Sequence, residues 1–134
     1  MNPDELLAKA LNVRIIAYAP YSQFQVGAAL ETQSGKVFTG CNVENLSFGL
    51  TICAERNAVF AAVAAGEREF ARIVIVADSQ EPVTPCGACR QVMAEFSLEM
   101  EVRSVNLQGR EYVARLDELL PRAKAGILDK PSST

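Results

Sequence analysis

Three cysteines and one glutamate are spaced as the ligands and the proton carrier of a catalytic zinc site require. Cys53 is followed two residues later by Glu55, and Cys86 and Cys89 form a Cys-x-x-Cys pair. Catalytic zinc sites typically take three ligands from the protein and keep the fourth position for water. The chain contains no histidine, so the first ligand of this pattern must be Cys53. We expect zinc to activate water here, with Glu55 exchanging a proton with that water.

Other interpretations of these residues remain open. A closed structural zinc site needs a fourth ligand, which Cys41 could supply. We expect Cys41 to lie inside a strand as a small apolar residue instead. Glu55 could simply complement the dipole at a helix N-terminus, although a structural site has no need for a carboxylate there. The combined pattern therefore favours an open, catalytic site.

Charge compensation is the second requirement of such a site. Three thiolates on Zn²⁺ leave a net charge of about −1, which weakens the metal as a Lewis acid. The ligands fall at the starts of two expected helices, whose positive ends lower the pKa of thiols. Arg56 lies three residues after Cys53 on the same helical face. We expect its guanidinium to donate to the thiolates, the alternative being an arginine at the surface.

Apolar periodicity predicts the elements that position these residues. An apolar stripe near period 3.6 indicates a helix over 3–18, and a β-branched run indicates a buried strand over 73–77. Alanine on every side of 53–66 predicts a buried helix. The remaining expected strands are 24–31, 36–43, 100–107 and 110–113, and the remaining expected helices are 87–97 and 116–120. This order favours a three-layer α/β fold, one mixed five-stranded sheet with helices on both faces.

Composition limits the class of protein. With 134 residues and no internal linker, we expect one domain over 1–134, frayed from about residue 125. The net charge of −3 and the absence of a basic patch argue against nucleic acid or an anionic membrane as partner. No stretch approaches the ~18 apolar residues of a membrane span, and no signal peptide is evident. We therefore expect a cytoplasmic protein, where cysteines more often bind metal than form disulfides.

At this point the sequence resembles the cytidine deaminase family, in its short homotetrameric class with cysteine ligands. The resemblance spans roughly residues 10 to 121. Its motifs are the segments 18–29, 40–45, 53–58, 85–91 and 119–121. It implies one Zn²⁺ per subunit, and hydrolysis of cytidine or 2'-deoxycytidine to uridine or 2'-deoxyuridine and ammonia in pyrimidine salvage. It also implies a homotetramer whose subunits share active sites.

The resemblance also implies roles for individual residues. Glu55 takes a proton from water, delivers it to N3 of the ring and then helps protonate the leaving amine. The Ala54 amide holds the pyrimidine O2. Asn42 and Glu44 bind the ribose hydroxyls, and Phe24 packs against the nucleoside. Backbone carbonyls near residues 84–85 accept from the leaving amino group.

One position departs from the family pattern. Lys124 stands where the family has an aromatic residue that stacks on the base in a neighbouring subunit. This keeps open a related deaminase that acts on a nucleoside analogue or a modified base. A zinc-stabilised structural module is the alternative outside enzymes.

Overall fold

The fold is built on one mixed sheet of five strands in the order β2-β1-β3-β4-β5. The structure is a computed structural model that describes residues 1–126 and 128. Strands β3 and β4 pair in parallel, and the other neighbours pair antiparallel. The strands are β1 (Val26–Thr32), β2 (Val37–Cys41), β3 (Phe70–Ala77), β4 (Glu101–Asn106) and β5 (Glu111–Arg115).

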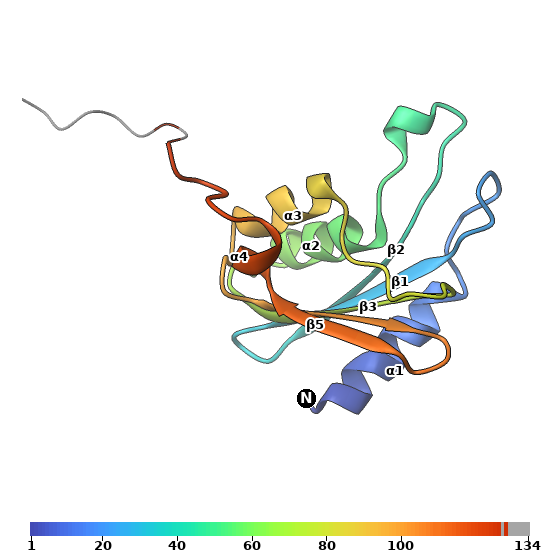
Figure 1. Cartoon of the computed structure of the whole chain (residues 1–134), viewed down its shortest axis with the longest axis horizontal. Coiled ribbons are helices and arrows are strands. Elements are labelled where there is room, and N and C mark those ends of the chain that lie inside the picture. Colours follow the sequence, from blue (N-terminus) through green and yellow to red (C-terminus); the bar gives the residue numbers. More distant parts are fainter. Residues whose placement is uncertain (127, 129–134) are drawn as a thin grey trace, which may run out of the picture.

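Helices cover both faces of the sheet (Figure 1). Helix α1 (Pro3–Arg14) lies on one face, and α2 (Ala54–Ala64) and α3 (Gly87–Ala94) lie on the other. The short α4 (Leu116–Leu119) packs beside α3, and a 3₁₀ turn, η1 (Phe48–Leu50), lies in the connection from β2 to α2. The three-layer α/β fold predicted from the sequence is therefore confirmed.

The two faces of β3 bury two separate apolar clusters. Ile73 and Ile75 face α2 and α3, whereas Val74 and Val76 face α1. Successive side chains of a strand point to opposite faces, so a strand covered on both faces must be apolar at every position. This explains the continuous β-branched run. Among the described residues, no helix is both long and apolar enough to cross a membrane.

Two expectations about the helices are wrong. The first helix ends at Arg14 rather than residue 18, because the Tyr18 amide donates to the Asn42 carbonyl, which ties this segment to the chain after β2. Helix α2 is not buried on every side: Ala58 is inaccessible, but Phe60 is 48% exposed. The predicted fraying from about residue 125 falls largely on residues 127 and 129–134, which lie outside the described residues.

Strand β2 and helix α2 approach each other at backbone contact. A Cβ atom added to Gly40 would lie 2.4 Å from the Ala54 carbonyl oxygen and 2.4 Å from the Ala58 nitrogen. Real Cβ atoms do not come this close to backbone atoms. Gly40 therefore sets the distance between β2, which leads into Asn42, and the first turn of α2, which carries Glu55.

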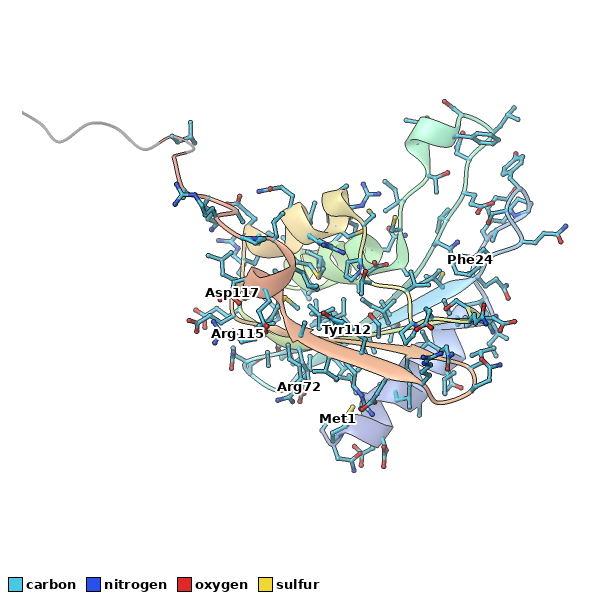
Figure 2. All side chains as sticks on the ribbon, viewed as in Figure 1. Met1, Phe24, Arg72, Tyr112, Arg115 and Asp117 are labelled. Carbon is cyan, nitrogen blue, oxygen red and sulfur yellow. The ribbon has the colours of Figure 1, made fainter. Side chains whose placement is uncertain are left out.

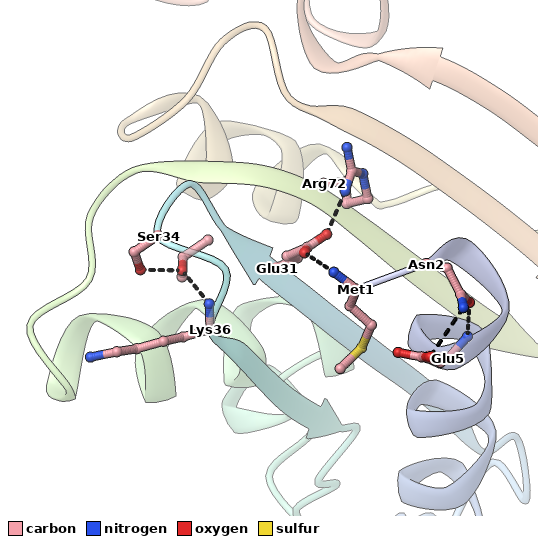
Figure 3. Close-up of polar contacts among 8 residues, drawn as sticks. Met1, Asn2, Glu5, Glu31, Ser34, Lys36 and Arg72 are labelled. Atoms are coloured by element: carbon pink, nitrogen blue, oxygen red, sulfur yellow. Dashed lines mark hydrogen bonds and ion pairs between the residues drawn. The ribbon is translucent and has the colours of Figure 1, made fainter.

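A buried carboxylate joins the N-terminus to the sheet. Glu31, on β1, is 5% exposed and accepts hydrogen bonds from the Met1 amino group and from Arg72 on β3 (Figure 3). Burial opposes ionisation of Glu31, but the hydrogen bonds from Met1 and Arg72 and their positive charges prevail and lower its pKa. The ionised carboxylate therefore stabilises the fold.

Replacing Gly40 by alanine should lower the free energy of unfolding by about 1–3 kcal/mol, the usual cost of overpacking. Catalytic activity of the folded fraction should fall as well, because α2 must move away from β2. Denaturant titration and activity assays measure the two effects. Thr39→Ala, an exposed neighbour on the same strand, should change stability by no more than about 0.5 kcal/mol. Equal stability of both variants would show that the approach of β2 to α2 at Gly40 leaves room for a side chain.

Replacing Glu31 by glutamine should lower stability near neutral pH by about 1–2 kcal/mol, with partial exposure of Arg72 limiting the effect. The folded pKa lies below the ordinary value of 4.5. The carboxylate's contribution is therefore fully present above that value and is lost as the pH falls through the folded pKa. Thermal denaturation of both proteins between about pH 7 and pH 3 should show the difference shrinking toward acid. A constant or widening difference would contradict this assignment.

Candidate active site

Three cysteine sulfurs converge between the starts of α2 and α3. Cys53 is the N-cap of α2, Cys86 is the N-cap of α3, and Cys89 lies in the first turns of α3. The sulfurs of Cys53 and Cys86 are 3.9 Å apart and those of Cys86 and Cys89 are 3.5 Å apart. A tetrahedral Zn²⁺ with bonds of about 2.3 Å holds sulfur ligands about 3.8 Å apart. The donor set therefore fits zinc in both type and spacing.

Cys41 is separate from this cluster. It is the last residue of β2 and is half-buried, rather than fully buried within a strand as expected. Burial raises the pKa of its thiol. Among the residues that the structure describes, the cluster able to hold a metal consists of the other three cysteines. The cluster thus has the three protein ligands of an open site.

The electrostatics of the cluster favour thiolates. A hydrogen bond from the Cys89 thiol, followed by the Arg56 guanidinium, lowers the pKa of Cys53 to about 5. The Arg56 Nη2 atom lies 3.4 Å from the Cys53 sulfur, so the sequence-based placement of this arginine beside the thiols agrees with the structure. The hydrogen bond to Cys53 and burial raise the pKa of Cys89. A divalent cation bound by all three sulfurs would displace the remaining protons.

Glu55 is a buried carboxyl beside the cysteine cluster. It lies in the first turn of α2 and is 5% exposed. Burial raises its pKa to about 7, and the negative charge of Cys53 adds to the effect. A carboxyl whose pKa lies near neutrality can both accept and release a proton, which general acid–base catalysis requires.

A cavity of about 240 Å³ opens onto the cluster. Its volume suits a single small molecule. Figure 2 shows Phe24 just before β1, near the segment that runs from β2 to α2. The residues lining the cavity are Ser22, Phe24, Val26, Asn42, Glu44, Thr51, Cys53, Ala54, Glu55, Val83, Thr84 and Cys86. The structure thus brings together all the residues predicted to touch substrate, with two of the three cysteines.

Asn42 and Glu44 also hold the loop opposite them. The Asn42 amide group donates to the Phe24 carbonyl at 2.8 Å, and its oxygen accepts from the Val26 amide at 2.8 Å. The Glu44 carboxylate accepts from the backbone amides of residues 21–22 at 2.9 and 3.1 Å. Each of these side chains therefore has a structural role besides lining the cavity.

Arg90 is a residue of the site whose contacts were not predicted from the sequence. Its guanidinium donates to the Pro85 carbonyl at 2.6 Å, the Leu119 carbonyl at 2.8 Å and the Thr84 hydroxyl at 3.1 Å. It thereby fixes the segment before Cys86 against the end of α4. The sequence signal that could have predicted these contacts is an arginine directly after a metal ligand on a packed helix, because its five donors need acceptors nearby.

Lys124 does not line the cavity. Its Nζ atom donates to the Glu95 carbonyl at 2.9 Å, at the C-terminal end of α3. A cation at this position interacts favourably with the helix dipole. Lys124, at the position where the sequence resemblance predicts an aromatic residue, therefore caps the C-terminal end of α3 in its own chain.

The comparisons with known proteins agree with this chemistry. The model of the zinc-binding region of cytidine and deoxycytidylate deaminases matches residues 1–104. A cytidine deaminase of Halalkalibacterium halodurans is 50% identical over 124 residues, which cover 92% of this chain and 94% of that protein. A cytidine deaminase of Sporosarcina psychrophila is 47% identical over 124 residues, 92% of this chain and 91% of that protein.

A solved structure extends the likeness to the fold. The crystal structure of cytidine deaminase from Burkholderia pseudomallei matches with a TM-score of 0.88 and 53% sequence identity, covering 90% of this chain and 98% of that one. The likeness in sequence runs across both halves of the cysteine cluster, and the likeness in structure runs across all three layers. This chain belongs to the cytidine deaminase family of zinc-dependent hydrolytic enzymes.

Proposed function

We propose that the chain hydrolyses cytidine and 2'-deoxycytidine to uridine and 2'-deoxyuridine, with release of ammonia. The observation that carries the proposal is one cavity that joins buried Glu55 and the cysteine sulfurs to Asn42 and Glu44. The sulfurs and Glu55 offer the chemistry of deamination, and the two polar side chains offer partners for a sugar. Free nucleosides are therefore the substrate class, and pyrimidine salvage in the cytoplasm is the role, without nucleic-acid or membrane partners.

The metal would be held by Cys53, Cys86 and Cys89, one ion per subunit. When bound, zinc supplies the Lewis acidity that makes water a nucleophile at neutral pH. The N-termini of α2 and α3 and the guanidinium of Arg56 offset the negative charge of the thiolates. This compensation would preserve the Lewis acidity of a metal held by three thiolates.

Glu55 is the proposed proton carrier. Its carboxyl takes one proton from the attacking water and delivers it to N3 of the ring. It then takes the proton of the new C4 hydroxyl and delivers it to the amine, which leaves as ammonia while the C4 carbonyl forms. Its position in the first turn of α2, two residues after Cys53, supports this role. Burial keeps its protons from exchanging with bulk water.

Backbone and side-chain groups place the nucleoside. The Ala54 amide at the start of α2 donates to the pyrimidine O2, and Phe24 packs against the nucleoside. Asn42 and Glu44 bind the sugar hydroxyls. Backbone carbonyls near Thr84 and Pro85 accept from the leaving amino group; the Pro85 carbonyl, which also accepts from Arg90, keeps a second lone pair.

The connection between β2 and α2 supports assembly into a homotetramer with shared active sites. This segment stands away from the layers (Figure 1). Leu46, Phe48 and Leu50 on it are 79%, 72% and 63% exposed. An apolar projection of this kind is typical of a subunit interface. Phe48 lines a second hollow together with Glu44 and Thr51, which also line the catalytic cavity, and this supports an interface beside the active site.

A related deaminase that acts on a nucleoside analogue or a modified base is the second candidate. The observation that favours it is Lys124, which caps α3 where the family has a stacking aromatic residue. Asn42 and Glu44 argue for an ordinary sugar.

A substrate panel tests the proposed function. Purified protein with its zinc content measured should deaminate cytidine and 2'-deoxycytidine, followed by the loss of ultraviolet absorbance. Cytosine and CMP should react much more slowly, because cytosine has no sugar for Glu44 and the phosphate of CMP would approach its carboxylate. Zinc-loaded, folded protein without activity on either nucleoside would overturn the proposal. Activity confined to an analogue would establish the second candidate instead.

The Glu55→Gln variant tests the proton carrier. Turnover should fall by about 10²–10⁴-fold, the usual contribution of general acid–base catalysis, while one zinc per subunit remains. Steady-state kinetics and zinc analysis on the same sample measure both. Glu101→Gln, at an exposed position on β4, is the matched control and should keep full activity. Substantial turnover by Glu55→Gln would assign the proton transfer to another group.

A further inference from the structure

We propose that Ser22 is a positioning residue that holds the Glu44 carboxylate ready to accept a hydrogen bond from the sugar of the substrate. The inference rests on the proposed function, because it deepens the role given there to Glu44. Ser22 lines the same cavity as Glu44, Glu55 and two of the cysteine sulfurs.

Three donors on neighbouring residues fix the Glu44 carboxylate. Its Oε1 atom accepts from the Tyr21 amide at 2.9 Å and from the Ser22 amide at 3.1 Å. Its Oε2 atom accepts from the Ser22 hydroxyl. Each carboxylate oxygen offers about two lone-pair positions, so Oε1 is fully used and Oε2 keeps one position. Among the described residues, no other donor takes that position.

The direction of the Ser22 hydroxyl bond is also fixed. The Ser22 oxygen accepts from the Phe24 amide at 3.0 Å. A hydroxyl has one proton to donate, and an ionised carboxylate can only accept. The Ser22 proton must therefore point at Glu44, and these hydrogen bonds lower the pKa of Glu44. A carboxylate held in this state accepts a hydrogen bond from a sugar hydroxyl and cannot donate one.

The backbone around Ser22 is held in an uncommon conformation. Gln23, between Ser22 and Phe24, has a φ of 57°, a region that side chains other than glycine rarely adopt. The Ser22 hydroxyl spans this residue by bonding Phe24 on one side and Glu44 on the other. A residue at this position without a hydroxyl would lose both the donor to Glu44 and the acceptor for Phe24.

Loss of the Ser22 hydroxyl should weaken binding of the sugar and leave the reaction at the ring unchanged. Ser22 touches Glu44, whereas Glu55 and the sulfurs act on the base. Truncation of Ser22 should therefore raise KM and leave kcat nearly unchanged. The effect should also depend on the sugar hydroxyls of the substrate, which a residue that only stabilises the loop would not require.

The test compares Ser22→Ala with the unaltered protein on cytidine and on 2',3'-dideoxycytidine. For cytidine, kcat/KM should fall about 3- to 10-fold through KM, the range expected for one hydrogen bond to a charged group. For the dideoxy nucleoside, which has neither hydroxyl, it should change less than about twofold. Equal losses on both substrates would overturn the inference. An unaltered protein inactive on cytidine would instead overturn the proposed function, and the inference with it.

Two further variants separate positioning from folding. Ser22→Thr keeps the hydroxyl and should restore most of the affinity for cytidine, even if Ser22→Ala proves unstable. Ser34→Ala is the matched control. Ser34 lies on the turn between β1 and β2 (Figure 3), and its hydroxyl also donates to a carboxylate, that of Glu67. This substitution should leave both substrates unaffected. Failure of Ser22→Thr to restore affinity in a folded protein would also overturn the inference.

Discussion

The structure depends on holding three cysteine sulfurs, which bind a metal as anionic thiolates, within 4.8 Å of one another. Coulomb repulsion at such distances is large unless positive charge faces it. Two helix N-termini and one guanidinium supply that charge. Cys53 and Cys86 are the N-caps of α2 and α3, and Arg56 lies in the first turn of α2. The starts of α2 and α3 must therefore lie side by side, and much of the rest of the fold serves that arrangement.

The topology provides this juxtaposition. Strands β3 and β4 are parallel, so α3 crosses between them and begins at the edge where β3 ends. Ligand sites in α/β sheets commonly lie outside the carboxyl ends of strands. Helix α2 precedes β3, and its distance from β2 is set by Gly40. Arg90 then ties the segment before Cys86 to the end of α4. The cysteine cluster is thus held in place by the close packing at Gly40 and by the Arg90 side chain.

The chemistry of the cluster could be predicted from the sequence because the short spacings within each motif are typical of metal ligands, although the fold is needed to bring the two motifs together. A Cys-x-x-Cys pair at a helix start, and a Cys-x-Glu at another, leave little freedom in where the side chains point. The end of α1 could not be predicted in the same way, because it depends on a hydrogen bond from the Tyr18 amide to the carbonyl of the distant Asn42. The exposed side of α2 was missed because alanine is compatible with both water and a core. The contacts of Arg90 were missed because most of its acceptors are backbone carbonyls, which every residue has and which residue type therefore cannot identify.

The proposed division of the cavity between sugar and base is compatible with Lys124 at a position where the sequence resemblance predicts an aromatic residue. Among the residues that the structure describes, Phe24 is the one aromatic side chain that lines the cavity. Stacking of an aromatic pair contributes about 0.5–1.5 kcal/mol beyond buried area, which is roughly a tenfold effect at most. A polar group left unpaired in a buried site costs about 1–3 kcal/mol. Under the proposed function, hydrogen bonds from Ala54, Glu55 and Glu44 therefore contribute more to discrimination between nucleosides than one stacking ring does.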